Sequence, residues 1–494
     1  MVNRKLEKKE NFVKNDIHSF LKAKKEKKPC QYIVIPSMSF DRELLEGIEG
    51  VSHYELRSLW EILRVKDKNV YVTFVSSYKI PFSTLKHFKE IYNLSAEEFS
   101  RVSFVEISRK KNILSLTKNI LIDESALKKI KKTFKCENVL LEPFVFTHQE
   151  KALSRLLEIP SWYDHPQMNY FHTKSGNRFI VGSSAPMPDG LGDLFSFDAV
   201  VKGVIKLKND KPGLESCMVK LNFGVSGQGN MKLDLPSGKA WEALLPKEKE
   251  DSIRNCFESA KLFNKTLKAS DFKQRIIEEG AVVEEFISNE IISSPSAQIF
   301  CKPDSIDLIS THHQILDKSG QKFLGGSYPC DDQFRKKIEK FSIKVGEKLK
   351  DLKVFGVVSI DFLISKNQKT SELDYHLIEL NIRKGGTTHP FMLSNFAIKS
   401  NEHFEAGPPS REFTDNYVYR SNDNFYPCRT RYSCQKDILE KATADGILFS
   451  RKKKEGVIFH LLSSYEETGK VGYTILASSK DRIDQLEALI NGEV

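Results

Sequence analysis

The sequence predicts an α/β protein of about three domains. Short apolar runs typical of buried strands alternate with helical periodicities over the first 150 residues. The 494 residues exceed the roughly 100–200 that one domain usually contains. Hydrophobic residues make up 40% and charged residues 29%, which is ordinary for globular proteins and argues against disorder of the whole chain. No apolar run approaches the roughly 18–20 residues of a transmembrane helix.

The positive charge is concentrated at the N-terminus. Residues 1–28 hold ten basic and four acidic side chains, so this segment carries +6 of the net charge of +10. It lacks the apolar stretch of a signal peptide. We interpret it as a solvated extension that can form a helix, with an arm that binds nucleic acid or an anionic membrane as the alternative. Nucleic-acid-binding proteins more often carry basic charge through the folded body, so no nucleic-acid or membrane partner is predicted.

The eight cysteines are scattered and form no C-x-x-C pair. Together with the missing signal peptide, this favours a reducing, cytoplasmic location. Cys428 and Cys434 have no histidine partner at zinc spacing, so a zinc site is not predicted. Cys217 lies in an apolar run and is interpreted as a packed thiol.

The first domain is predicted to contain an open parallel sheet. Its strands are expected at residues 31–36, 70–75 and 102–107, which are short and apolar. Between the first two, Leu56, Leu59, Trp60 and Leu63 recur at helical spacing. Strands that alternate with helices indicate a parallel α/β arrangement up to about residue 150. No glycine-rich turn follows the first strand, so the dinucleotide-binding fingerprint is absent.

The rest of the chain alternates loops, strands and helices. The amphipathic pattern over residues 331–352 predicts a long helix that Asp331 or Asp332 would cap. Residues 405–494 have strand signals of their own and a final helical pattern, which predicts a small C-terminal α/β domain. Further segments are expected as a loop (183–193), a helix (198–208) and extended chain (217–223 and 281–287).

A glycine-rich segment follows a strand that carries a lysine. Residues 217–230 read CMVKLNFGVSGQGN, and alternation places Lys220 on the face opposite the apolar side chains. Glycines let backbone N–H groups approach an anion, and a lysine adds a point charge, so this segment predicts a phosphate clamp. Asn230 after Gly229 excludes a Walker A loop, and Lys232 excludes G-x-G-x-x-G. A flexible hairpin turn is the alternative.

Two later strands carry oxygen ligands. Simple alternation over residues 375–383 places Glu379 and Asn381 on one face, about 6–7 Å apart, together with Tyr375, Leu377 and Arg383. Asp361 interrupts an apolar run, which is costly unless the carboxylate is paired or binds a metal. Two carboxylates and an amide oxygen suit Mg²⁺. An ordinary polar strand edge is the alternative. Between the two motifs, residues 282–287 (VVEEFI) suit a nucleotide's base and ribose, although strand-end glutamates are common.

The order of these motifs resembles the ATP-grasp superfamily, and in more detail the pheganomycin-type peptide ligases. The similarity spans roughly residues 30–490 and is most specific at IELNIRKGGTTHPF, residues 378–391. It implies a basic extension (1–28), a pre-ATP-grasp domain (29–170), a two-lobed ATP-grasp domain (171–400) and a C-terminal domain (401–494). Within the ATP-grasp domain, residues 171–290 would cover the nucleotide, and residues 291–400 would hold the metal and the catalytic groups.

The resemblance also implies roles for individual residues. Arg383 and Lys220 would be the catalytic cations, and Mg²⁺ would be held by Asp361, Glu379 and Asn381. The residues expected to bind ATP are Lys174, Lys220, Gly227, Gly229, Asn230, Glu284, Glu285, Phe286, Ile287 and, for the ribose, Glu290. The acceptor region would include His312, Gly385, Gly386, Thr387 and Thr388. His313 stands where the motif of the family has an acid. His312 is interpreted as structural or substrate-side, with a catalytic base as the alternative. His460 is interpreted as packed and Lys384 as solvated.

These roles imply a cytoplasmic ATP- and Mg²⁺-dependent ligase. It would phosphorylate a carboxylate, and an amine would then attack the acyl phosphate to form a peptide or amide bond with release of ADP and phosphate. The expected partners are small molecules, an amino-acid-like carboxylate and an amino acid or peptide amine; homodimerisation is left open. One alternative is an ATP-grasp kinase that phosphorylates a hydroxyl. Another is a non-catalytic nucleotide-binding protein, against which the intact metal set argues.

Overall fold

The structure is a computed structural model of the chain. It describes residues 16–40, 42–108, 115–224, 227, 229–236, 239–264, 267–317, 320, 323–398, 417–427 and 432–492. Residues 1–15 of the basic segment therefore lie outside the described residues. Helix α2 (Ile17–Lys25) buries Phe20 and Ala23. For these residues the prediction of a solvated extension is wrong, because two apolar side chains spaced three apart form a buried stripe.

The first domain contains the predicted parallel sheet. Its strands are β1 (Cys30–Ile35), β2 (Val70–Ser76), β3 (Val102–Glu106) and β4 (Asn138–Pro143), in the order β3-β2-β1-β4. The helical pattern after β1 forms a 3₁₀ helix, η1 (Val51–Lys66), which buries Leu56, Leu59, Trp60 and Leu63. The other helices are α3 (Arg42–Glu46), α4 (Phe82–Tyr92), α5 (Ala96–Ser100), α6 (Leu116–Leu121), α7 (Glu124–Lys131), α8 (His148–Leu157) and α9 (Met168–Phe171). Helix α10 (Lys174–Val181) follows and also contacts the next segment.

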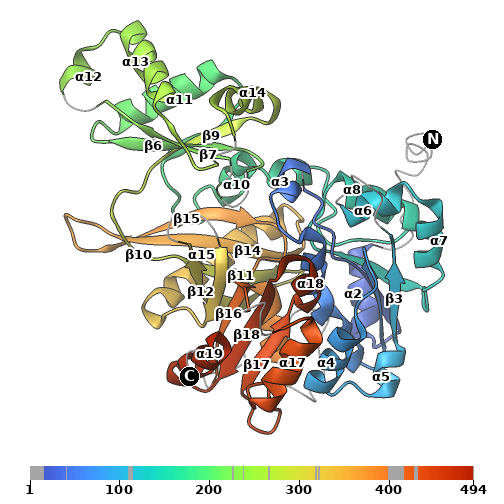
Figure 1. The fold of residues 1–494 in the computed structure, drawn as a ribbon. Helices are drawn as coiled ribbons and strands as arrows, with labels where there is room; N and C mark the ends of the chain where they lie inside the picture. The colour runs from blue at the N-terminus through green and yellow to red at the C-terminus, as the bar shows by residue number, and fades with distance from the viewer. Residues whose placement is uncertain are drawn as a thin grey trace.

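The next segment forms a lobe that stands at the top of Figure 1. Its sheet has the order β5-β9-β6-β7-β8, with antiparallel pairing throughout. The strands are β5 (Gly190–Leu194), β6 (Ser216–Leu221), β7 (Asn230–Asp234), β8 (Lys261–Leu262) and β9 (Ala281–Glu285), and the helices are α11 (Phe197–Asp210), α12 (Lys239–Ala243), α13 (Pro246–Glu258) and α14 (Ala269–Glu279). Residues 190–193, which the sequence predicted as the end of a loop, instead belong to strand β5, which pairs with β9. This lobe has a core of its own between residues 200 and 283.

The largest sheet has nine strands and contains the candidate site. Its order is β10-β14-β11-β12-β13-β16-β18-β17, with β15 paired to β14. Helix α15 (Asp332–Asp351), predicted from its periodicity, packs on β11 and β12. The strands are β10 (Glu290–Ser293), β11 (Pro295–Cys301), β12 (Ile306–Leu316), β13 (Phe323–Tyr328), β14 (Gly356–Lys366), β15 (Leu373–Asn381), β16 (Val418–Phe425), β17 (Gly456–His460) and β18 (Val471–Ala477).

The C-terminal strands continue this sheet. β16 pairs with β13, so β16, β18 and β17 extend the sheet that carries β14 and β15. A single hydrophobic core accordingly runs from Phe20 in α2 to Leu476 in β18. The remaining helices are α16 (Thr388–Ile398), α17 (Gln435–Ala444), η3 (Leu462–Ser464), α18 (Tyr465–Thr468) and α19 (Lys480–Asn491). The proposed boundaries between domains stay predictions.

The cysteines are unpaired wherever the structure describes them. Cys217 is fully buried, and burial raises the pKa of its thiol to about 12, as expected for a packed side chain. Among the described helices, none combines the length and the apolar character needed to cross a bilayer.

Candidate active site

The predicted oxygen ligands meet on two neighbouring strands. Asp361 on β14 lies directly opposite Glu379 on β15, and Asn381 follows on the same face. Asn381 Nδ2 donates a hydrogen bond to Asp361 Oδ2 at 3.0 Å. Gln314 Nε2 from β12 donates to Asp361 Oδ1 at 2.8 Å. Three strands therefore converge on one carboxylate.

A β-bulge at Ile378 corrects the predicted faces of β15. Phe362 pairs with Leu377 and Asp361 with Glu379, so one extra residue stands between the two pairs. As a result, Tyr375 and Leu377 point into the core. The sequence had predicted both side chains on the same face as Glu379. The prediction failed because simple alternation cannot detect an inserted residue. The bulge leaves Glu379 and Asn381 together, as predicted.

The two carboxylates have opposite pKa shifts. Burial, and then the adjacent Glu379, raise the pKa of Asp361 to about 7. Burial also acts to raise the pKa of Glu379, but Lys174 and Arg383 outweigh it and hold the pKa at about 2. A divalent cation beside both groups would relieve the repulsion between them. The two facing carboxylates therefore fit Mg²⁺. Asn381 would add an amide oxygen once its side-chain amide turned, because its Nδ2 donates to Asp361 and Glu379 in this structure.

Two lysines from different elements reach this region. Lys174 opens α10, and its Nζ lies 2.9 Å from Glu379 Oε1. Lys220 on β6 lies with its Nζ 2.5 Å from Glu284 Oε2, and Arg178 Nη1 lies 3.1 Å from Glu284 Oε1. Lys174 thus connects the upper lobe to the carboxylates, while Lys220 is held within the lobe. The positive charge of Lys220 also contributes to the low pKa of Glu379.

Arg383 lies just beyond β15. Its charge lowers the pKa of both Asp361 and Glu379, although burial is the largest influence on each. The guanidinium carbon lies 5.7 Å from the ring centroid of Phe40 and 5.9 Å from that of Phe144, both in the first domain. Arg383 is therefore positioned between the carboxylates and the first domain.

The glycine-rich segment forms the turn between β6 and β7. Leu221 N–H donates to the carbonyl of Gly229 at 2.9 Å, and Asn230 N–H donates to Gly227 at 3.1 Å. A Cβ atom at Gly224 would lie 2.7 Å from Gly229 Cα, so the two backbones require glycine at this crossing. This geometry suits both the predicted phosphate cover and the alternative of a hairpin turn. Residues 225, 226 and 228 lie outside the described residues.

The predicted nucleotide linker follows β9. Glu285 Oε2 lies 2.5 Å from Lys211 Nζ, and its Oε1 accepts from the backbone of Asp189 at 2.9 Å. Phe286 and Ile287 are half-buried, and Lys232 Nζ lies 4.7 Å from the Phe286 ring centroid. Glu290 is exposed on β10 opposite Lys366. That position is about 17 Å along β14 from Asp361, so the structure does not bring Glu290 to the carboxylates.

Comparison with known proteins identifies the fold. A family profile described as IQCH-like, ATP-grasp matches residues 260–394, and one described as PGM1 C-terminal domain matches residues 437–490. The structure is similar to N5-carboxyaminoimidazole ribonucleotide synthetase bound to ADP (TM-score 0.54, 8% identity), with 94% of this chain and 96% of that chain covered. It is also similar to biotin carboxylase from Campylobacter jejuni (TM-score 0.57, 13% identity), with 94% and 91% covered.

The chain has the ATP-grasp fold. The predicted fold class and the resemblance to an ATP-grasp ligase are thereby confirmed. The L-propargylglycine–L-glutamate ligase of Streptantibioticus cattleyicolor is 22% identical over 484 residues, which are 93% of this chain and 94% of that enzyme. IQ motif-containing protein H of Danio rerio is 20% identical over 392 residues, which are 71% of this chain and 37% of that protein.

The loop between β15 and α16, residues 382–387, is tightly packed and is called the ATP-grasp loop below. A Cβ atom at Gly385 would lie 2.6 Å from Ser359 Oγ, and one at Gly386 would lie 2.7 Å from the Phe323 ring. Gly385 N–H donates to Thr388 Oγ1 at 2.9 Å, and Thr388 Oγ1 donates to Gln298 Oε1 at 2.5 Å. Thr387 is buried beside them. The predicted acceptor residues of this loop therefore follow Arg383 closely in the sequence, and packing and hydrogen bonds hold them in place.

His312 is part of the core. It has no exposed surface, and its Nε2 lies 2.6 Å from Tyr419 Oη on β16. Burial lowers its pKa to about 3, so the imidazole is neutral at pH 7. This position suits a structural histidine, one of the roles considered from the sequence. His460 is likewise buried, as predicted.

Lys384 was expected to be solvated, and this prediction is wrong. Its Nζ lies 2.6 Å from Glu142 Oε1 and 2.8 Å from Glu61 Oε1, and the three side chains are at most 3% exposed. Arg64 Nε also lies 2.5 Å from Glu61 Oε2. The sequence carried only part of the signal: Glu61 and Glu142 interrupt apolar runs and buried acids need partners, but nothing in it named Lys384 as that partner. The cluster anchors the ATP-grasp loop to the first domain.

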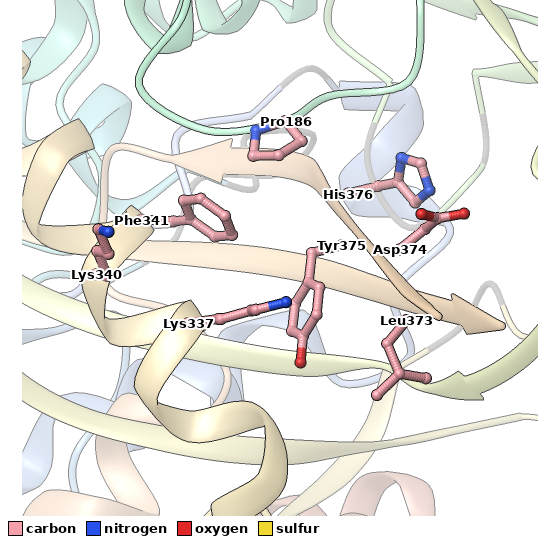
Figure 2. A pocket seen from close by; sticks show the side chains of 8 residues that line it. All are labelled: Pro186, Lys337, Lys340, Phe341, Leu373, Asp374, Tyr375 and His376. Carbon is pink, nitrogen blue, oxygen red and sulfur yellow. The ribbon is translucent and has the colours of Figure 1, made fainter. Parts of the chain in front are cut away.

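A pocket of about 400 Å³ lies at the other end of β15 (Figure 2). It lies between α15 and the first residues of β15, and Lys337 Nζ lies 4.6 Å from the Tyr375 ring centroid. Tyr375 precedes the bulge and belongs to the core side of the strand. We therefore treat this pocket as separate from the carboxylates of the ATP-grasp site.

Proposed function

We propose that this protein is an ATP- and Mg²⁺-dependent ligase that joins a carboxylate to an amine and releases ADP and phosphate. The observation that carries the proposal is the charge arrangement around Glu379. Two carboxylates and an amide meet there with Lys174 and Arg383. Transfer of a phosphoryl group to an anionic carboxylate requires that the negative charge of both reactants is neutralised, and the cations of this cluster supply the positive charge.

The overall similarity favours a ligase within the ATP-grasp fold. The relative that matches over 93% of this chain is named as a ligase of two amino acids. The similarity extends through all the segments, which favours a common reaction rather than a common nucleotide site alone. We infer that the substrates here are also amino-acid-like, one of them reacting through a carboxylate and the other through an amine.

The chemistry needs no protein nucleophile. A substrate carboxylate oxygen bonds to the γ-phosphorus of ATP while the bond from that phosphorus to the β-bridging oxygen breaks, and ADP leaves. The amine nitrogen then bonds to the acyl carbon, phosphate departs with the C–O bonding electrons, and the nitrogen loses a proton. Lys220 and Lys174 would neutralise the phosphates, and Arg383 would bind the transferred phosphoryl group.

Asp361, Glu379 and Asn381 would hold Mg²⁺. The metal would supply charge neutralisation on the phosphate oxygens. Because Glu379 is shared with Lys174, the lysine and the metal ligands face the same part of the site. Their positions on paired strands of a large sheet keep this arrangement rigid.

The proposal is tested by product analysis. The protein is incubated with ATP, Mg²⁺ and L-glutamate paired in turn with each other common amino acid, and ADP and new masses are measured. We expect a product whose mass is the sum of two substrates minus water, with one ADP for each product. The Asp361→Asn protein, prepared in the same way, serves as the control for contaminating ATPase.

The alternatives give different products. AMP and pyrophosphate would exclude the acyl-phosphate route. ADP release with a single substrate and a phosphorylated product would indicate a kinase. Nucleotide binding with no turnover across the panel, including peptides as amines, would favour a non-catalytic protein.

A further inference from the structure

Lys470 is a buried cation without an acidic partner in the described part of the chain. It stands just before β18 and is 3% exposed. Its Nζ donates one hydrogen bond, to Tyr54 Oη at 2.9 Å, and lies 4.9 Å from the centroid of the Tyr54 ring. An ammonium group has three donors, and a phenol cannot neutralise its charge. A buried charge of this kind is costly unless a ligand supplies the opposite charge.

A second cation packs against the same ring. The guanidinium carbon of Arg57 lies 4.2 Å from the Tyr54 centroid. Arg57 pairs with Asp423, but Asp423 is shared, because His389 Nε2 lies 3.1 Å from its Oδ1 and His460 Nδ1 lies 3.5 Å from it. The Nε of Arg57 is buried and has no hydrogen-bond partner among the described residues. The two cations around Tyr54 are thus matched by one carboxylate.

This cationic pair lies next to the phosphoryl-transfer site. His389, which contacts the partner of Arg57, is in the first turn of α16 and six residues after Arg383. Burial lowers the pKa of Arg383, and the charge of Arg57 lowers it further, so the two guanidinium groups are within electrostatic range. Tyr54 and Arg57 are partly exposed, whereas Lys470 and the Nε atom of Arg57 are buried. Positive charge therefore extends from Arg383 toward the C-terminal strands.

The cluster of His389, Asp423 and His460 also has the composition of a metal site. Their ligand atoms lie within 4.8 Å of one another. However, Arg57 already neutralises Asp423, and a divalent cation would add two positive charges beside Arg57 and Lys470. The excess positive charge favours an anionic ligand over a metal ion.

We propose that Lys470 and Arg57 bind the carboxylate of the acceptor substrate, the one that supplies the amine. The inference rests on the proposed ligase function. The reacting carboxylate must lie at Arg383 and the metal ligands, so a carboxylate held around Tyr54 is a second one, and the proposal assigns it to the amine substrate. The acceptor is accordingly an amino acid or peptide with a free carboxylate. Charge-assisted hydrogen bonds to Lys and Arg give such recognition its strength.

The test uses Lys470→Met, which keeps the length of the side chain and removes its charge. With L-glutamate and a panel of amino acids, we expect the acceptor KM to rise at least about tenfold. Hydroxylamine, an amine without a carboxylate, is the comparison acceptor, and its KM should rise far less. The wild-type protein should prefer amino acids to their methyl esters, and the variant should lose most of that preference.

Lys384→Met is the matched control for stability, because Lys384 is equally buried but has two acidic partners. We expect Lys470→Met to melt at or above the temperature of the wild-type protein and Lys384→Met to melt well below it. Equal acceptor KM values for wild type and Lys470→Met would overturn the proposal, as would a loss of stability like that of the control. If the wild-type protein forms neither amide nor hydroxamate, the ligase function itself fails. Calorimetry of amino-acid binding then tests the carboxylate site separately. No binding to the wild-type protein, or equal binding to wild type and Lys470→Met, would overturn the site.

Discussion

At the residue scale, Glu379 joins the proposed metal ligands to the cations. It lies opposite Asp361 across two strands and pairs with Lys174 from α10. Its low pKa keeps it ionised at pH 7, whereas Asp361 has a pKa of about 7 and is only partly ionised there. Near neutral pH, therefore, a change of pH alters the ionisation of Asp361 but not that of Glu379.

Glu379→Gln removes one proposed metal ligand and the charge partner of Lys174. We expect kcat/KM to fall at least about 100-fold with the fold preserved, because the loss affects charge at the reacting phosphate. Steady-state kinetics and circular dichroism provide the check. Glu372→Gln, at an exposed position just before β15, is the control and should behave as wild type. Turnover close to normal in Glu379→Gln would contradict the metal assignment.

Asp361 predicts a pH effect on stability. Its folded pKa, about 7, exceeds the ordinary value of 3.8, so the carboxyl stabilises the folded protein at low pH and this contribution is lost as the pH rises to about 7. Buried histidines with lowered pKa values, such as His312, act in the opposite direction. The difference in unfolding free energy between Asp361→Asn and wild type gives the contribution of the Asp361 carboxyl group, because the histidines are present in both proteins. In EDTA this difference should grow in favour of the variant from pH 5 to pH 8.

Added Mg²⁺ should reverse that trend, because the cation favours the ionised carboxylate. Chemical denaturation at several pH values measures both conditions. A difference that does not change with pH would show that Asp361 has an ordinary pKa.

At the element scale, the loop after β15 is held from both sides. Lys384 anchors it to η1 and β4 through Glu61 and Glu142. Gly385 packs against Ser359 on β14, and His389 reaches Asp423 on β16. The position of Arg383 thus depends on the first domain, the central sheet and the C-terminal strands together.

Gly385→Ala tests this dependence. The added Cβ would lie 2.6 Å from Ser359 Oγ, so the loop must shift. We expect a loss of about 1–3 kcal/mol in stability and a fall in kcat/KM of at least about tenfold, because Arg383 moves with the loop. Adding Ser359→Gly to this variant should restore part of the activity, and Ser359→Gly alone is the control. Full activity in Gly385→Ala would mean that the loop does not position Arg383.

At the scale of the whole molecule, the hydrophobic cores divide the protein unevenly. One core runs from α2 to β18 and includes residues of the first domain, the central sheet and the C-terminal strands. The upper lobe has a separate core formed by residues between Val200 and Val283. Two further cores lie within the first domain and within the C-terminal segment, each beside the shared core. A core shared by distant segments couples them, whereas a separate core allows a lobe to open by itself.

Hydrogen exchange should reveal this division. We expect amides of β6, β7 and β9 to exchange as one unit, faster than those of β11, β14 and β18. ATP with Mg²⁺ should slow exchange in the upper lobe more than in β17 and β18, because the lobe would cover the nucleotide. Mass spectrometry of peptides measures both effects. Uniform exchange across all strands would contradict an independently opening lobe.

The amino-acid sequence was sufficient for the elements whose signal is local. Parallel strands buried on both faces are nearly continuous apolar runs, so β1 and β2 were predictable. The half-buried edge strand β3 was predictable from its Val and Phe residues. The long periodicity of α15 and the motif order of the ATP-grasp fold were also local signals. Asp361, Glu379 and Asn381 could be named because polar residues in apolar strands stand out.

The tertiary structure alone decided which distant residues meet. The bulge at Ile378 depends on pairing with β14, and alternation along one strand does not encode it. Lys384 and Glu142 are 242 residues apart in the sequence, so neither residue predicts the other. The pair of Arg57 and Lys470 around Tyr54 arises in the same way, because burial and charge compensation are properties of the packed chain rather than of any segment.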